Sequence, residues 1–280
     1  MSTRDFRALL DARSASGHTV CVGLDSLLER LPASARKADD PQARFNADII
    51  DATSDLAAAY KPNAAFYEAR GTAGIQALIS TTQYAHEAAP EVPVIVDAKR
   101  GDIGTTNDGY AQFLFDVVGA DAITVHPYLG AEAARAFLVR PEKGIYVLCR
   151  TSNPGAGELQ DLRVTYDGAQ IPLYEAVARN VNLLWNANRN CGLVVGATYP
   201  QELAEIRRLV PDLPLLLPGV GAQGADVHDT VAALGTHTGA PVVINSSRGI
   251  IFAGDGPDYP QKARQATADL DAEVRRIRAG

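Results

Sequence analysis

Short apolar runs alternate along the chain with longer segments whose apolar residues recur every three or four positions. In one such segment Phe45, Ile49 and Leu56 fall on one face of a helix. Strands that are buried on both faces and alternate with helices indicate a parallel sheet. The short runs predict eight strands, at residues 20–24, 58–61, 92–97, 122–125, 144–149, 192–195, 214–217 and 241–245.

Eight strand–helix units indicate an α/β protein with a single (β/α)8 TIM barrel over residues 1–280. An open, doubly wound sheet would be expected to carry GxGxxG after the first strand, and the chain reads VGLD at 22–25 instead. No linker composition marks a second domain. The connection at 151–171 is unusually long, polar and rich in glycine, which predicts an active-site lid.

Composition narrows the class of protein. The 280 residues are 46% hydrophobic and 6% aromatic, which suits helices packed on a parallel sheet around one large core. The net charge is −7, and the densest cationic stretch, at 273–278, resembles a solvated terminal helix. We therefore expect no nucleic-acid partner.

Cysteine usage and the N-terminus bear on location. Cys21, Cys149 and Cys191 lie in or beside apolar runs without CxxC spacing, which favours buried thiols in a reducing compartment over a metal site. The first ten residues are charged and do not resemble a signal peptide. No stretch approaches the roughly 18 apolar residues of a membrane span. We expect a cytoplasmic protein with no membrane partner.

Polar side chains gather where the predicted strands end, which in a barrel is where active sites are built. A solvated rim is the alternative explanation. The apolar surroundings of Lys61, Asp97 and Lys99 favour a shared reactive pocket instead. His126 could be catalytic, but a hydrogen-bonded rim histidine is favoured. The strand-end residues are Asp25, Lys61, Asn63, Asp97, Lys99, Asp102, His126, Ser152 and Arg248.

The end of the third strand has the most distinctive sequence, VDAKRGDIGTT at 96–106. Asp97 and Lys99 are two residues apart, so on a regular strand they share a face with roughly 7 Å between Cα atoms. A lysine among carboxylates keeps its proton, because nearby negative charge favours the ammonium form. Such a lysine suits stabilising a developing anion and protonating it better than acting as a base or a Schiff-base nucleophile.

A second signature follows the seventh and eighth strands. The chain reads LPGVGAQG at 217–224 and NSSRG at 245–249. Glycines let backbone N–H groups approach an anion, and Arg248 offers a two-pronged donor. Because barrels frequently bind phosphate after these two strands, the position predicts a phosphate site.

These motifs resemble those of the orotidine 5′-phosphate decarboxylase family. The run at 97–106 is similar to its DxKxGDIxxT signature, and the resemblance extends to Asp25, YKPN at 60–63, SNPG at 152–155 and the loop at 218–224. The resemblance covers nearly the whole chain. The length of the chain, and the form of its KPN run at 61–63, resemble the longer bacterial subgroup of the family. The resemblance implies decarboxylation of orotidine 5′-monophosphate (OMP) to UMP by a homodimer without a metal or another cofactor.

The resemblance also implies roles for single residues. Lys61, Asp97, Lys99 and Asp102 would form an alternating charged array, with Asp102 supplied by the partner subunit. Lys99 would protonate C6 of the pyrimidine after carbon dioxide leaves, and Asp97 would lie against the substrate carboxylate. The implied substrate-binding residues are Asp25, Asn63 and Thr106 for the ribose, Ile103 on the partner side, Ser152 for the pyrimidine, Gln223 and Arg248 for the phosphate, and Pro218.

The chain departs from the pattern of the family at one place, and two alternative functions remain to be considered. Shorter members place arginine in a Gly-Arg-Ser turn where this chain has SSRG at 246–249, so the backbone part of the phosphate contact is open. A magnesium-dependent sugar-phosphate lyase or decarboxylase would share the Asp-x-Lys-x-x-Asp fragment but would need more carboxylates near strand two. A non-catalytic nucleotide-binding barrel would be expected to lack part of the charged array.

Overall fold

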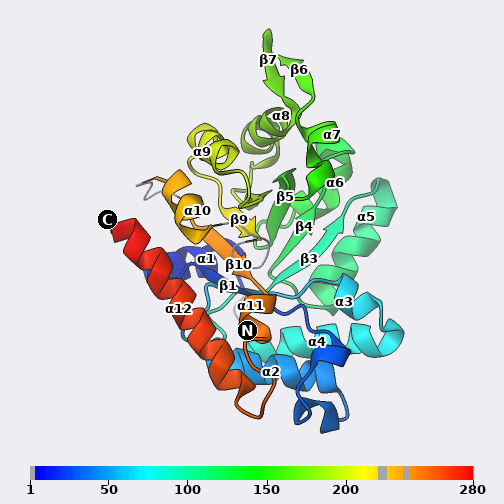
Figure 1. The fold of residues 1–280 in the computed structure, drawn as a ribbon. Coiled ribbons are helices and arrows are strands. Elements are labelled where there is room, and N and C mark those ends of the chain that lie inside the picture. The colour runs from blue at the N-terminus through cyan, green and yellow to red at the C-terminus, as the bar shows by residue number, and fades with distance from the viewer. Residues whose placement is uncertain (1–3, 220–225, 236–239, 280) are drawn as a thin grey trace.

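The computed structural model describes residues 4–219, 226–235 and 240–279. Eight parallel strands pair in the order β2-β1-β10-β9-β8-β5-β4-β3 (Figure 1). Bridges from Tyr60 to Val94 and from Asn63 to Asp97 join β2 to β3 and close the barrel. The strands are β1 Val20–Gly23, β2 Ala59–Lys61, β3 Ile95–Arg100, β4 Ala122–Val125, β5 Gly144–Arg150, β8 Cys191–Val195, β9 Leu215–Pro218 and β10 Val242–Ser246.

The predicted (β/α)8 barrel and all eight strand positions are confirmed, with one boundary substantially wrong. Strand three was expected over 92–97, but β3 runs from Ile95 to Arg100. Arg100 pairs with Val125 after a shift in register that begins at Val96. Within this shift Lys99 has a φ of +46°, so regular alternation of side chains does not hold there.

Helices surround the barrel, and local sequence accounts for where they begin. In α2, Pro41 occupies the first turn, and the Asp40 carboxylate accepts hydrogen bonds from the backbone N–H groups of Gln42 and Ala43. Apart from α7 Gly157–Gln160, which lies in the connection after β5, the other α-helices are α1 Phe6–Ala15, α3 Ala65–Glu68, α4 Gly71–Ala88, α5 Gly104–Ala111, α6 Gly130–Leu138, α8 Leu173–Asn180, α9 Pro200–Leu209, α10 Val227–Ala233, α11 Arg248–Ile251 and α12 Tyr259–Ala279. The turns η3 Gln112–Val117 and η5 Val181–Trp185 are π-helical, and η1 Leu28–Arg30 and η2 Ala35–Lys37 are 3₁₀ turns.

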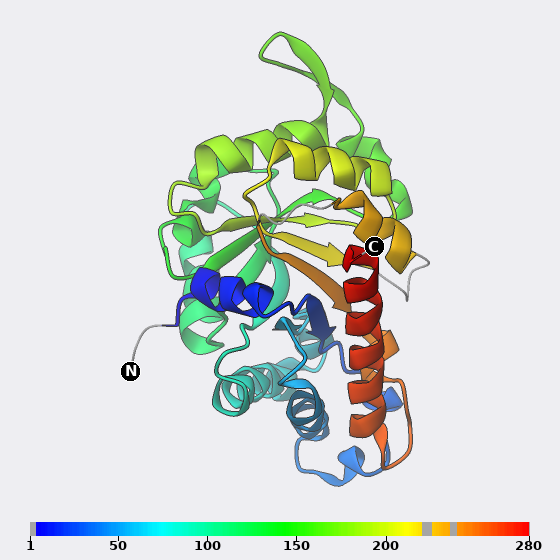
Figure 2. The ribbon, with the colours of Figure 1, turned by 90° about the vertical axis from the view of Figure 1, so that its left-hand side faces the viewer.

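The amino end of the barrel is plugged, which leaves the carboxyl end for the site. Phe6 and Leu10 of α1 pack beneath an interior layer that includes Tyr146, and the rings of Phe6 and Tyr146 meet edge to face at 5.8 Å. Figure 2 shows α1 lying across this end of the strands. The three cysteines are buried and unpaired, as expected.

The long connection after β5 is ordered rather than a simple loop. It contains η4 Pro154–Ala156, α7 Gly157–Gln160 and an antiparallel hairpin of β6 Arg163–Tyr166 and β7 Ala169–Pro172. Asp167 and Gly168 form its turn, and both have positive φ. The hairpin projects beyond the helical layer (Figure 1). A lid function for 151–171 stays a prediction. Among the described residues, no helix combines the length and hydropathy needed to cross a membrane.

Candidate active site

A cavity of about 840 Å³ opens at the carboxyl ends of the strands. Its volume lies in the range of small-molecule sites. Charged and polar side chains occupy one part of the wall, and Leu148, Val194 and Leu216 supply an apolar part. The sequence-predicted residues that line it are Asp25, Lys61, Asn63, Asp97, Lys99, Ser152, Pro218 and Arg248.

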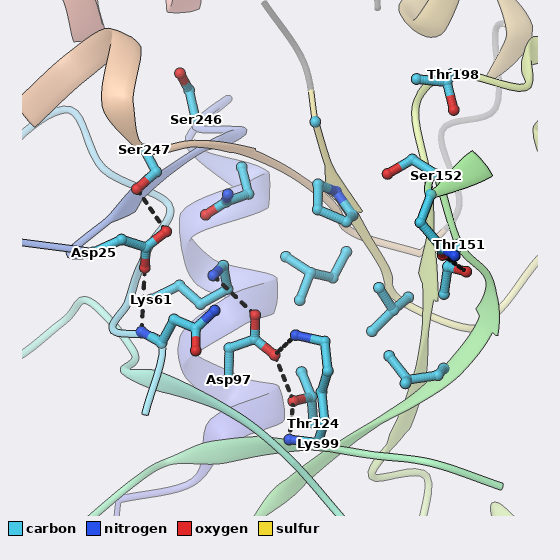
Figure 3. A pocket seen from close by; sticks show the side chains of 18 of the residues that line it. Asp25, Lys61, Asp97, Lys99, Thr124, Thr151, Ser152, Thr198, Ser246 and Ser247 are labelled. Carbon is cyan, nitrogen blue, oxygen red and sulfur yellow. Dashed lines mark hydrogen bonds and ion pairs between the residues drawn. The ribbon is translucent and has the colours of Figure 1, made fainter. Parts of the chain in front are cut away.

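Asp97 lies between two lysines (Figure 3). Its Oδ2 is 3.3 Å from Lys61 Nζ, and its Oδ1 is 2.6 Å from Lys99 Nζ. Thr124 of β4 donates its hydroxyl to Oδ1 at 2.8 Å and accepts the backbone N–H of Lys99 at 2.9 Å. One threonine therefore fixes both the carboxylate and the backbone that carries Lys99.

Burial and charge act in opposite directions on this cluster. Lys61 is 3% exposed, and burial works to lower its pKa, but the charges of Asp97 and Asp25 outweigh burial and hold the pKa above its usual value. Burial would raise the pKa of Asp97, whereas Lys61 and then Lys99 hold it well below its usual range. The carboxylate and the buried ammonium are therefore both charged at neutral pH.

A second carboxylate is fixed on the β1 side. Ser247 donates its hydroxyl to Asp25 Oδ2 at 2.7 Å, and the backbone N–H of Asn63 donates to Oδ1 at 3.2 Å. This contact needs a glycine in β1, because a Cβ on Gly23 would lie 2.6 Å from Ser247 Cβ. Close approach of β1 to the loop after β10 thus orients Asp25 toward the cavity.

The expected phosphate and pyrimidine residues lie around the same opening. Arg248, at the start of α11, is exposed and lines the cavity with Pro218 and Gly219. Figure 3 shows Ser152 across the cavity from Asp25. Gln223 lies outside the described residues.

Three of the predicted site residues are not among the described residues that line this cavity. The backbone of Asp102 is held by Asn107, whose side chain bonds to both the N–H and the carbonyl of Asp102. Ile103 is 62% exposed, and Thr106 is exposed on α5. A single chain therefore assembles Lys61, Asp97 and Lys99 but does not bring Asp102 to them.

His126 is hydrogen-bonded, as its favoured interpretation expects. Its Nε2 is 3.0 Å from the carbonyl oxygen of Gly101, and its Nδ1 accepts the backbone N–H of Tyr128 at 3.3 Å. His126 is not among the described residues that line the cavity.

Sequence reasoning missed several polar residues of the cavity wall. Thr124 sits inside a short apolar run, and the pairing of β4 with β3 brings it to Asp97. Asn245 is 7% exposed and lines the cavity, and its Oδ1 has no hydrogen-bond partner among the described residues. A polar residue ending the apolar run 241–245 was the available signal. Thr198 and Gln160 also line the cavity.

The charges in the cavity disfavour a bound metal ion. The cavity carboxylates Asp25 and Asp97 are already engaged, and two ammonium groups beside Asp97 disfavour a divalent cation there. Among the described residues, three metal-ligating side chains lie close together only at Asp226, His228 and Asp229, all of which are exposed. Asp226 caps α10 through two backbone N–H groups. We assign no ligand function to this group.

Eight parallel strands closed into a barrel, with ionised side chains gathered at their carboxyl ends, define a (β/α)8-barrel enzyme. The model of the orotidine 5′-phosphate decarboxylase / HUMPS family matches residues 18–262. The chain belongs to this family.

Curated relatives and solved structures narrow the comparison to proteins named for the decarboxylase. Orotidine 5′-phosphate decarboxylase of Thermomicrobium roseum is 46% identical over 98% of this chain and 96% of its own length. That of Halorubrum lacusprofundi is 51% identical over 91% and 90%. The structure of OMP decarboxylase from Leishmania donovani matches with a TM-score of 0.81 and 37% identity, covering 99% of both chains.

Proposed function

We propose that this chain decarboxylates OMP to UMP and carbon dioxide, the last step of de novo UMP biosynthesis. Family membership and the full-length relatives named for this activity support the proposal. The structural observation that carries it is the Asp97 carboxylate with Lys99 Nζ on one oxygen and Lys61 Nζ on the other.

The reaction breaks the bond between C6 and the carboxylate carbon, and the electron pair stays on C6. A fixed ammonium group beside C6 stabilises this charge as it develops. We assign that role to Lys99, which then transfers a proton to C6 and regains one from water. Asp97 holds Lys99 in place, and Lys61 balances the charge of Asp97 in the buried wall. No metal or other cofactor takes part in this scheme.

Groups remote from C6 would supply binding energy. We assign the ribose hydroxyls to Asp25 and Asn63, the pyrimidine edge to Ser152, and the phosphate to Arg248 and Gln223. Pro218 would line the phosphate side. Contacts to the phosphate stabilise the transition state when they hold the reacting carbon against Lys99.

The proposal includes a homodimer with shared sites. Asp102, Ile103 and Thr106 lie outside the cavity of their own chain, and Ile103 exposes an apolar side chain. In the dimer, Asp102 of the partner subunit completes the charged array, while Ile103 and Thr106 of the partner subunit contact the nucleotide. A cytoplasmic location is part of the same proposal.

Loss of the orotate chromophore in excess EDTA tests the function directly. We expect purified protein to convert OMP to UMP at a rate that EDTA does not change. Turnover that requires added magnesium would contradict the metal-free scheme. Binding of OMP without turnover would favour a nucleotide-binding barrel, and the absence of both would direct the assay to sugar phosphates with magnesium.

A further inference from the structure

The segment that carries Ser152 is held by a carboxamide from α7. Gln160 Oε1 accepts the backbone N–H of Thr151 at 2.9 Å and Nη1 of Arg150 at 3.3 Å. Gln160 Nε2 donates to Thr151 Oγ1 at 2.8 Å, and Thr151 Oγ1 donates to Asn153 Oδ1 at 2.7 Å. The hydrogen bonds of Gln160 thus hold Thr151 directly and Asn153 through Thr151, and these are the two neighbours of Ser152 in the chain.

The donors and acceptors allow one orientation of this amide. Arg150 and the backbone of Thr151 can only donate, so the oxygen of Gln160 must face them. The amide nitrogen then faces the Thr151 hydroxyl. This hydroxyl accepts a hydrogen bond from the amide and donates its own to Asn153 Oδ1. If the amide were rotated by 180°, its NH₂ group would face the donors of Arg150 and of the Thr151 backbone. The orientation of the Gln160 amide is therefore fixed by its partners.

Close contacts hold the segment on two sides. Arg150 is 3% exposed, its guanidinium lies 4.2 Å from the ring centre of Tyr199, and its Nη2 lies 3.3 Å from Asp161. On the β8 side the N–H of Gly196 donates to the Arg150 carbonyl at 2.7 Å, and a Cβ on Gly196 would lie 2.8 Å from Ser152 N. Ser152 is therefore seated between the end of β8 and the network of Gln160.

We propose that Gln160 is a positioning residue that sets specificity for the pyrimidine by fixing the backbone around Ser152. The inference rests on the proposed function, in which Ser152 contacts the pyrimidine edge. Gln160 acts through Thr151 and Asn153. Its loss therefore affects recognition of the base and leaves the ribose and phosphate contacts on the other walls unchanged.

The test compares Gln160→Ala with a matched control, Gln76→Ala. Gln76 also donates its amide to a side-chain hydroxyl, Ser80 Oγ at 3.4 Å, but it lies exposed on α4, outside the cavity and the predicted lid. We expect Gln160→Ala to lower kcat/KM for OMP and to weaken inhibition by UMP about tenfold each, from the loss of charged and neutral hydrogen bonds. Inhibition by ribose 5-phosphate, which has no base, stays unchanged. Gln76→Ala matches the wild type in all three measurements.

Two further variants separate positioning from general stability. Gln160→Glu keeps an oxygen for Arg150 and for the Thr151 N–H but loses the amide donor, so it loses less activity than Gln160→Ala. In a Ser152→Ala background, Gln160→Ala causes little additional loss. Additive losses, or equal weakening of UMP and ribose 5-phosphate, overturn the inference. If Gln160→Ala does not fold, Thr151→Val is measured in its place, because it removes the hydroxyl that joins Gln160 to Asn153.

The outcomes distinguish this inference from the proposed function. Wild-type protein that does not decarboxylate OMP, or a Ser152→Ala variant with unchanged kcat/KM, contradicts the proposed function. An active wild type that is weakened by Ser152→Ala but unaffected by Gln160→Ala contradicts only the role of Gln160.

Discussion

Lys99 Nζ lies 2.6 Å from Asp97 Oδ1, although the backbone of Lys99 adopts a φ of +46°. A non-glycine residue in the left-handed region costs about 1–2 kcal/mol. Residues held in such regions cluster at functional sites, where the surrounding structure over-determines them. Here the bond from the Lys99 N–H to Thr124 and the ion pair with Asp97 hold the residue in place.

Removing the ammonium group should abolish most activity. We expect Lys99→Ala to lower kcat for OMP at least about a thousandfold, because electrostatic stabilisation and the proton donor are lost together. Lys37→Ala, at an exposed lysine of η2, serves as the control. A Lys99→Ala protein with near wild-type kcat would rule out the assigned proton donor.

Asp97 is expected to link stability to pH. Its pKa is depressed in the folded state, so its contribution is fully present above the unfolded value of about 4 and is lost as pH falls toward the folded value. Asp97→Asn should cost about 3–5 kcal/mol near neutral pH, because Lys61 stays buried without its partner. Urea denaturation from pH 3 to 7 should show the difference from wild type shrinking below about pH 4. A difference independent of pH would be inconsistent with this linkage.

Mixing two inactive proteins tests the shared site. Asp102→Asn and Lys99→Ala dimers that exchange subunits form hybrids with one site free of substitutions. Random exchange should restore about a quarter of wild-type activity. Mass spectrometry of differently labelled subunits verifies the exchange. Demonstrated exchange without recovered activity would place Asp102 in its own chain's site or outside the site.

Arg248 should act on the phosphate alone. Arg248→Ala is expected to raise KM for OMP roughly 10–100-fold through loss of charge-assisted hydrogen bonds. Orotidine has no phosphate, so its slow turnover should be unaffected by the same substitution. Arg44→Ala, at an exposed position of α2, is the control. Equal effects on both substrates would assign Arg248 to the base or the ribose.

The strands were predictable because each is a short apolar run buried on both faces, as in Ala122–Val125. The charged array was predictable because Lys61, Asp97 and Lys99 are unusual neighbours for such runs. Parallel topology then places their strand ends together without further information.

The contacts that orient the array depend on pairing between distant strands. The left-handed backbone of Lys99 arises where β3 shifts its register against β4, which no local pattern in 96–100 reveals. Thr124 and Ser247 reach Asp97 and Asp25 across 27 and 222 positions of the chain. The hairpin after β5 was not predicted, because the polar, glycine-rich composition of 151–171 indicated only a long loop.

Closure of the barrel between β2 and β3 depends on two isolated bridges, one of them between Asn63 and Asp97. Every other neighbouring pair of strands shares at least two paired positions within a continuous ladder. Local opening of the barrel on heating should therefore begin at this seam between β2 and β3. The Asp97 amide donates across the seam to the Pro62 carbonyl, so its hydrogen exchange measures the opening. Opening the seam separates Lys61 from Asp97 while the helices stay intact. On heating, catalytic activity should consequently be lost at a lower temperature than the one at which the whole barrel unfolds.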